Sequence, residues 1–97
     1  MTLENKKIHL LRESRVPSTH TNPMTFGKNL RMVDRIYENS DRDTQAFLRK
    51  VMLARMNEAK AMVASPQYNK GEKSVIKSNR LAMEDIWQKW NEEMRYE

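Results

Sequence analysis

Two long amphipathic segments with opposite charge balance constrain this chain more than any other feature. The first spans residues 41–64 and carries an excess of basic residues; the second spans about 74–94 and becomes acidic after Leu81. Apolar residues recur at helical spacing in both, which is the pattern of a helix with one buried face. The two segments are therefore expected to pack on each other or on a partner.

The composition favours a small helical protein. The chain has 97 residues, enough for one domain with a modest core. Two glycines and three prolines leave few of the turns that a β architecture needs. Because 38% of the residues are hydrophobic and 32% are charged, we expect that a partner completes part of the core.

The fold class predicted is all-α, a small helical domain with a C-terminal antiparallel helical hairpin. Helices are predicted at residues 28–38, 41–64 and 74–95, with a short loop at 65–73 that makes the last two neighbours. Ser40 is predicted to cap the 41–64 helix, and Pro66 is predicted to follow its end. In the last helix, Met83, Trp87 and Trp90 share one face with Met94.

Residues 1–27 are predicted to form an N-terminal arm beside a helical domain at 28–97. Residues 3–12 fit a short helix somewhat better than a strand. Residues 14–27 contain Pro17 and Pro23, which favour extended backbone and remove hydrogen-bond donors. Such a segment either crosses the surface of a partner or forms an ordinary surface loop.

Five residues are candidates for contact with a protein partner. Trp87 and Trp90 suit an interface anchor, but they equally suit the core of this chain. Arg55 falls inside the apolar arc of its helix, where it would pair with a carboxylate or lay its methylenes on the core. Pro66 is a possible recognition point, although helix termination also explains it, and Tyr68 follows in the same loop.

A second set of candidates is basic and would bind the phosphates of DNA or RNA. Its members are Arg42, Arg49, Lys50, Lys60, Lys70, Lys73, Lys77 and Arg80. The alternative is a solvated helix face, and no aromatic residues interleave with these cations as a single-strand platform requires. The acidic C-terminal segment also makes a purely nucleic-acid-binding arm less fitting than the net charge of +5 suggests.

No motif indicates catalysis, a cofactor or a metal site. The chain has no cysteine, and His9 and His20 lack companion ligands at useful spacing. No phosphate-binding glycine loop, nucleophile elbow or paired-carboxylate motif occurs. The absence of an apolar run of about 20 residues and of a signal-peptide core favours a cytoplasmic protein without membrane insertion.

These observations favour a non-enzymatic accessory protein that binds and modulates a larger protein complex, for example a nucleic-acid-processing machine. One alternative is direct DNA or RNA binding through the basic 42–80 surface. Another is a structural subunit of a large ribonucleoprotein or membrane-associated complex. The layout is similar to that of many small accessory proteins, including phage-encoded inhibitors and adaptors, and this likeness is architectural.

Overall fold

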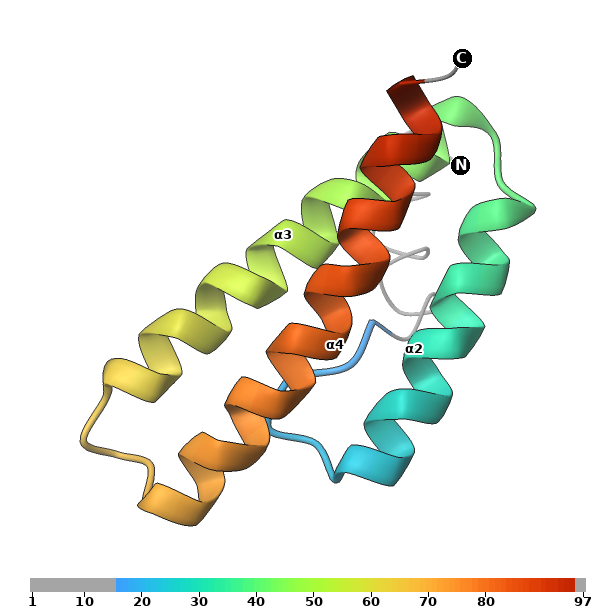
Figure 1. Cartoon of the computed structure of the whole chain (residues 1–97). Helices are drawn as coiled ribbons and strands as arrows, with labels where there is room; N and C mark the ends of the chain where they lie inside the picture. The colour runs from blue at the N-terminus through green and yellow to red at the C-terminus, as the bar shows by residue number, and fades with distance from the viewer. Residues whose placement is uncertain (1–15, 96–97) are drawn as a thin grey trace, which may run out of the picture.

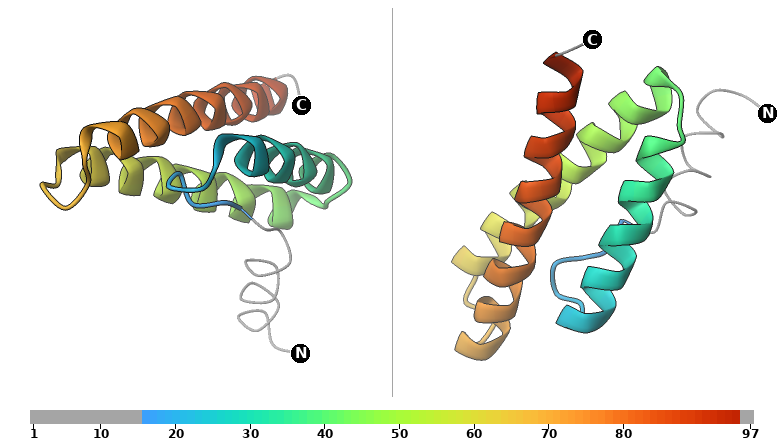
Figure 2. Two further views of the ribbon diagram at one scale, coloured as in Figure 1. Left: turned by 90° about the horizontal axis from the view of Figure 1, so that it is seen from below. Right: turned by 45° about the vertical axis from the view of Figure 1, so that its right-hand side comes forward.

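Three α-helices form the part of the chain that the computed structural model describes, residues 16–95 (Figure 1). They are α2 (Pro23–Glu38), α3 (Arg42–Ala64) and α4 (Lys70–Arg95). α3 and α4 run antiparallel as a hairpin, and α2 packs along one side of it (Figures 1 and 2). The all-α class and the hairpin are confirmed, and residues 16–95 contain no strand. The short helix predicted at 3–12 lies outside the described residues.

α2 begins at Pro23, five residues before the predicted start, so the prediction of extended backbone up to residue 27 is wrong there. The side-chain oxygen of Asn22 accepts a hydrogen bond from the backbone N–H of Met24 at 3.0 Å and caps the helix. Proline is well suited to the first helical position, because its missing N–H would have no partner there and its φ is already helical. Pro23 therefore starts the helix and does not extend the arm.

α3 is capped by Asp41 and not by Ser40, which corrects the predicted cap. The Asp41 carboxylate accepts from the backbone N–H of Thr44 at 2.8 Å, a charge-assisted bond at the positive end of the helix dipole. The hydroxyl of Ser40 instead donates to the carbonyl oxygen of Ile36 and closes the end of α2. The predicted helix end at Ala64 is confirmed.

α4 begins at Lys70, four residues earlier than predicted, so the loop between the hairpin helices is shorter than expected. Asn69 and Glu72 make a reciprocal pair of bonds. The Asn69 side chain accepts from the Glu72 backbone N–H at 2.8 Å, and the Glu72 carboxylate accepts from the Asn69 backbone N–H at 3.1 Å. This is a capping box, which satisfies two helix-terminal donors that otherwise lack partners.

The core lies where the three helices meet and is closed by Val16 from the chain that precedes α2. The apolar stripe predicted on each helix faces inward, except that Met94, near the end of α4, is 44% exposed. Fully buried side chains include Phe26, Val33, Leu48, Met52, Ile76, Met83 and Trp90. Each such residue contributes about 1.5–3 kcal/mol relative to an exposed position, so packing supplies most of the stability of so small a bundle.

Candidate protein-binding face

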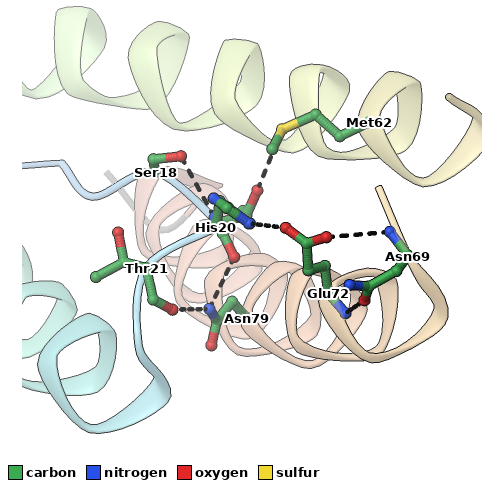
Figure 3. Close-up of polar contacts among 8 residues, drawn as sticks. Ser18, His20, Thr21, Met62, Asn69, Glu72 and Asn79 are labelled. Atoms are coloured by element: carbon green, nitrogen blue, oxygen red, sulfur yellow. Dashed lines mark hydrogen bonds and ion pairs between the residues drawn. The ribbon is translucent and has the colours of Figure 1, made fainter. Parts of the chain in front are cut away.

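Residues 16–22, which we call the strap, pack against the same side of the hairpin as α2 (Figures 2 and 3). The buried Asn79 side chain of α4 donates from its amide nitrogen to the carbonyl oxygens of Thr19 at 2.8 Å and Thr21 at 2.9 Å. The Thr19 hydroxyl lies 3.9 Å from the sulfur of Met62 on α3. The strap is therefore held by side chains of both hairpin helices and is unsuited to crossing a partner's surface.

A second contact holds the strap at the end of the hairpin loop (Figure 3). The His20 Nε2 atom lies 2.8 Å from a carboxylate oxygen of Glu72, and the His20 ring meets the Tyr68 ring edge-on at 5.3 Å between centroids. The backbone hydrogen bond from Asn69, followed by the bond to His20, holds the pKa of Glu72 below 4.5. Tyr68, a candidate for partner contact, is thus half-buried against the strap.

Trp90 is completely buried in the interior of the bundle. Its indole stacks on the ring of Tyr37 in α2, with centroids 4.0 Å apart and planes 3° from parallel. Its Nε1 donates to a carboxylate oxygen of Asp34 at 2.8 Å. Because the ring has no exposed surface, it offers no contact area to a partner of the folded chain.

Asp34 also joins α2 to α4 through a second bond. Its other carboxylate oxygen lies 2.6 Å from the Lys89 ammonium, and Glu38 lies 3.7 Å from the same ammonium. The hydrogen bond to Asp34 raises the pKa of Lys89 above its ordinary value. The side of α4 that carries Lys89 and Trp90 is thus occupied by α2.

Trp87 lies about 60° around α4 from Trp90, at the edge of the core, and is only half-buried. Its Nε1 donates to the carbonyl oxygen of Arg49 on α3 at 3.2 Å, which fixes the indole across the two hairpin helices. The ring borders two hollows. One, of about 250 Å³, lies between the hairpin helices and is lined by Leu53, Lys60 and Glu84 among others; the second lies beside Asn91 and Glu92.

These residues belong to a surface of the hairpin turned away from α2 and the strap, which we call the open face. Helical spacing places Lys50 beside Leu53 on it. The open face consists of Lys50, Leu53, Asn57 and Lys60 of α3 with Glu84, Trp87, Gln88, Asn91 and Glu92 of α4. Leu53 is 41% exposed and lies beside the Trp87 indole in the first of these hollows.

The sequence matches no protein-family model, no curated protein and no solved structure. Within residues 16–95, no helix is long and apolar enough to cross a membrane. The same residues contain no group of three or more His, Asp or Glu side chains placed to hold a metal ion.

The other candidates for partner contact do not lie together. The Arg55 guanidinium lies 3.2 Å from the carboxylate of Glu58 in its own helix, and its side chain is 36% exposed. It therefore pairs with neither α4 nor the core. Pro66 is exposed in the loop just after α3, at the end of the hairpin far from Arg55. Of the five candidates, only Trp87 lies on the open face.

The basic candidates are split between the two ends of the hairpin. Arg49 donates to the Tyr37 hydroxyl at 2.7 Å, and Arg42 lies near it beside a hollow of about 250 Å³. Arg80 pairs with Glu84 one turn away at 3.2 Å. Lys70, Lys73 and Lys77 occupy the first turns of α4, and Lys50 and Lys60 are exposed on α3. The cations thus do not form one continuous patch.

Sequence reasoning did not single out Leu53, Asp34 or Asn79. The sequence does carry a signal for Leu53, because this leucine lies about 60° around the helix from Met56 and widens the apolar arc toward the open face. Asp34 and Asn79 each act across more than 50 residues of sequence, and helical periodicity carries no signal for such contacts.

Proposed function

We propose that this protein is a non-enzymatic accessory protein that docks on a larger protein complex through its open face. The observation that carries the proposal is the placement of Trp87, a half-buried indole between two hollows at the centre of that face. Tryptophan is enriched among the residues that contribute most to binding energy, and such residues cluster near interface centres.

The chemistry around Trp87 fits a protein interface. Leu53 supplies apolar surface beside the indole. Lys60 and Glu84 lie toward one end of the face and Glu92 toward the other, so charges of both signs surround the apolar centre. An apolar centre with a polar rim is the usual anatomy of a non-obligate protein interface.

A nucleic-acid-processing machine is the class of complex that we favour. The cations at the start of α4 lie off the centre of the open face, where they can contact phosphates while the face contacts protein. Affinity for such an assembly would come both from protein contact and from the binding of these cations to phosphates, and the second part would weaken as the salt concentration rises.

Affinity purification tests the proposal with a matched pair of variants. Leu53→Asp places a charge at the centre of the open face, whereas Met24→Asp alters a residue that is 86% exposed on α2. We expect the wild-type chain and Met24→Asp to recover the same stoichiometric protein, with or without nuclease, and Leu53→Asp to lose it. Equal recovery by both variants, or no stoichiometric protein at all, contradicts the proposal.

Direct binding to DNA or RNA is the second candidate, favoured by the grouping of Lys70, Lys73 and Lys77 near the hairpin loop. It has less support, because Glu72 lies among these cations and Arg80 is already paired with Glu84. It predicts that affinity falls steeply with salt as condensed counterions are released. A gel shift in low salt with the Lys73→Glu/Lys77→Glu variant as control checks it, and an unshifted wild type rejects it.

A further inference from the structure

The end of the open face nearest the hairpin loop is basic. Lys60 of α3 lines the hollow between the hairpin helices, together with Arg80 and Glu84 of α4. Lys73 precedes Arg80 by seven residues, close to two full helical turns, and therefore projects from the same side of α4. Lys77 stands in the same relation to Glu84. Three lysines thus surround the loop end of this hollow.

The positive charge of these three lysines is not compensated by the chain itself. Within residues 16–95, none of the three makes an ion pair or a side-chain hydrogen bond. The carboxylate of Glu84, which lies among them, is already paired with Arg80 at 3.2 Å. Glu72, in the first turn of α4, is directed to the strap, where it pairs with His20. The loop end is therefore open to anionic groups of a partner.

We propose that the open face binds an acidic amphipathic helix of the partner, with an apolar side chain against Leu53 and Trp87 and carboxylates against the three lysines. The inference rests on the docking function proposed above and specifies the chemistry of the segment that docks. Charges at the rim of an interface steer a partner of opposite charge and fix its register, while the apolar centre supplies most of the binding energy. A basic segment would leave the lysines in repulsive contacts.

A helix fits the open face better than an extended segment does. Every residue of the face lies in α3 or α4, so the face offers side chains and no strand edge to which an extended chain could add. A segment that docks there must satisfy its own backbone hydrogen bonds, as a helix does. Trp87 lies about 15 Å along α4 from Lys77 and about 21 Å from Lys73, so a partner helix of about three to four turns reaches both.

The excess of positive charge is confined to the loop end of the face. At the far end, the exposed Lys50 and Glu92 carry opposite charges, and Gln88 and Asn91 are neutral. Carboxylates are therefore expected at the end of the partner helix that lies over the hairpin loop. Phosphates of a nucleic acid are competing anions for the same lysines, and the test accordingly includes DNA.

Fluorescence anisotropy with labelled synthetic helices measures this preference on the full chain. The probe is a peptide of about 16 residues with leucines at helical spacing and glutamates flanking them along its length, so that either orientation brings carboxylates to the lysines. One control peptide has lysine in place of every glutamate, and another has alanine in place of every leucine. In low salt we expect the acidic probe to bind at least about tenfold more tightly than either control.

Two double variants with the same change in net charge separate a local effect from a general one. Lys73→Glu/Lys77→Glu should weaken binding of the acidic probe roughly ten- to a hundredfold. Lys28→Glu/Arg31→Glu alters two exposed residues of α2 and should leave it nearly unchanged. Leu53→Asp should abolish binding, and circular dichroism should show unchanged helix content in every variant.

Three results would overturn the inference. The first is an equal affinity for the acidic and lysine probes, and the second is no binding of the acidic probe up to about 1 mM. The third is binding that survives Leu53→Asp and is displaced by duplex DNA, since the lysines would then form a phosphate surface separate from the apolar centre.

The partner helix and the docking function can fail separately. Binding of the acidic probe without capture of a larger complex would support the preference of the face for an acidic helix and reject the proposed function. Capture of a complex that is lost in Leu53→Asp, without a preference for the acidic probe, would support the function and reject the acidic helix.

Discussion

Replacement of Trp90 by alanine should destabilise this protein far more than replacement of Trp87, although the two residues are three positions apart. Trp90 is fully buried, stacks on Tyr37 and donates to Asp34, so truncation leaves a cavity and removes a donor from a carboxylate. A buried tryptophan truncated to alanine costs about 3–5 kcal/mol. For a half-buried indole such as Trp87, whose partner is a carbonyl oxygen, about 1–2 kcal/mol is expected.

The measurement is urea unfolding followed by circular dichroism at 222 nm, with thermal melts in parallel. A domain of this size loses about 4–8 °C in Tm per kcal/mol, so Trp90→Ala should lower Tm by roughly 15–30 °C. Trp90→Phe is the control, because it keeps an aromatic ring against Tyr37 while it loses the N–H donor and part of the indole volume, so it should cost clearly less than Trp90→Ala. If Trp87→Ala costs as much as Trp90→Ala, the division between a buried and an open side of α4 is wrong.

Three further predictions concern the polar contacts. Asn79→Ala should lower the free energy of unfolding, measured in urea, by about 2–4 kcal/mol, because two strap carbonyls lose their donor. Asn79→Asp should lower it further, because it places a carboxylate against the same carbonyls. Equal losses in the two variants would contradict the donor role of Asn79. The pKa of Glu72 is lowered in the folded chain, so the stability that its carboxylate contributes is present at neutral pH and is lost as pH falls through the folded pKa below 4.5. In thermal melts from about pH 3 to pH 7, the Tm of Glu72→Gln should therefore fall less on acidification than the Tm of the wild type. Identical Tm profiles would count against this. The hydrogen bond to Asp34 raises the pKa of Lys89, so the stability that this contact contributes is present below pH 10.5 and is lost as pH rises through the higher folded pKa. In thermal melts, Lys89→Met should be less stable than the wild type at about pH 8, and the difference should shrink as pH rises past 10.5. A difference that stays constant with pH would refute the linkage.

The apolar periodicity was sufficient to predict the class of fold, the hairpin and the inward face of each helix. It failed at two helix starts, and both failures have the same cause. Pro23 and Asn69 are residues that serve turns and helix caps equally well, and we assigned them to an extended linker and a loop. The Asn-Pro pair at residue 22 and the Asn-x-x-Glu spacing at residue 69 are the local signals that identify a cap.

The tertiary contacts that position the open face could not be predicted from one sequence. Asn79 meets the strap 60 residues away, and nothing in the helical pattern marks it as a donor to Thr19. Trp87 and Trp90 lie on the same apolar stripe of α4. The side on which α2 packs decides which indole is buried, and α2 is placed by contacts such as that between Asp34 and Lys89.

The opposite charges of the two long segments acquire a different meaning once α2 is in place. Packing of the hairpin alone would be expected to pair the basic helix with the acidic one. Instead, the ion pairs of Arg55 and Arg80 stay within their own helices, and Lys89 pairs across to α2. Lys60 and Glu92 remain exposed on the open face at opposite ends. Their charges therefore contribute more to whatever approaches that face than to the stability of the hairpin.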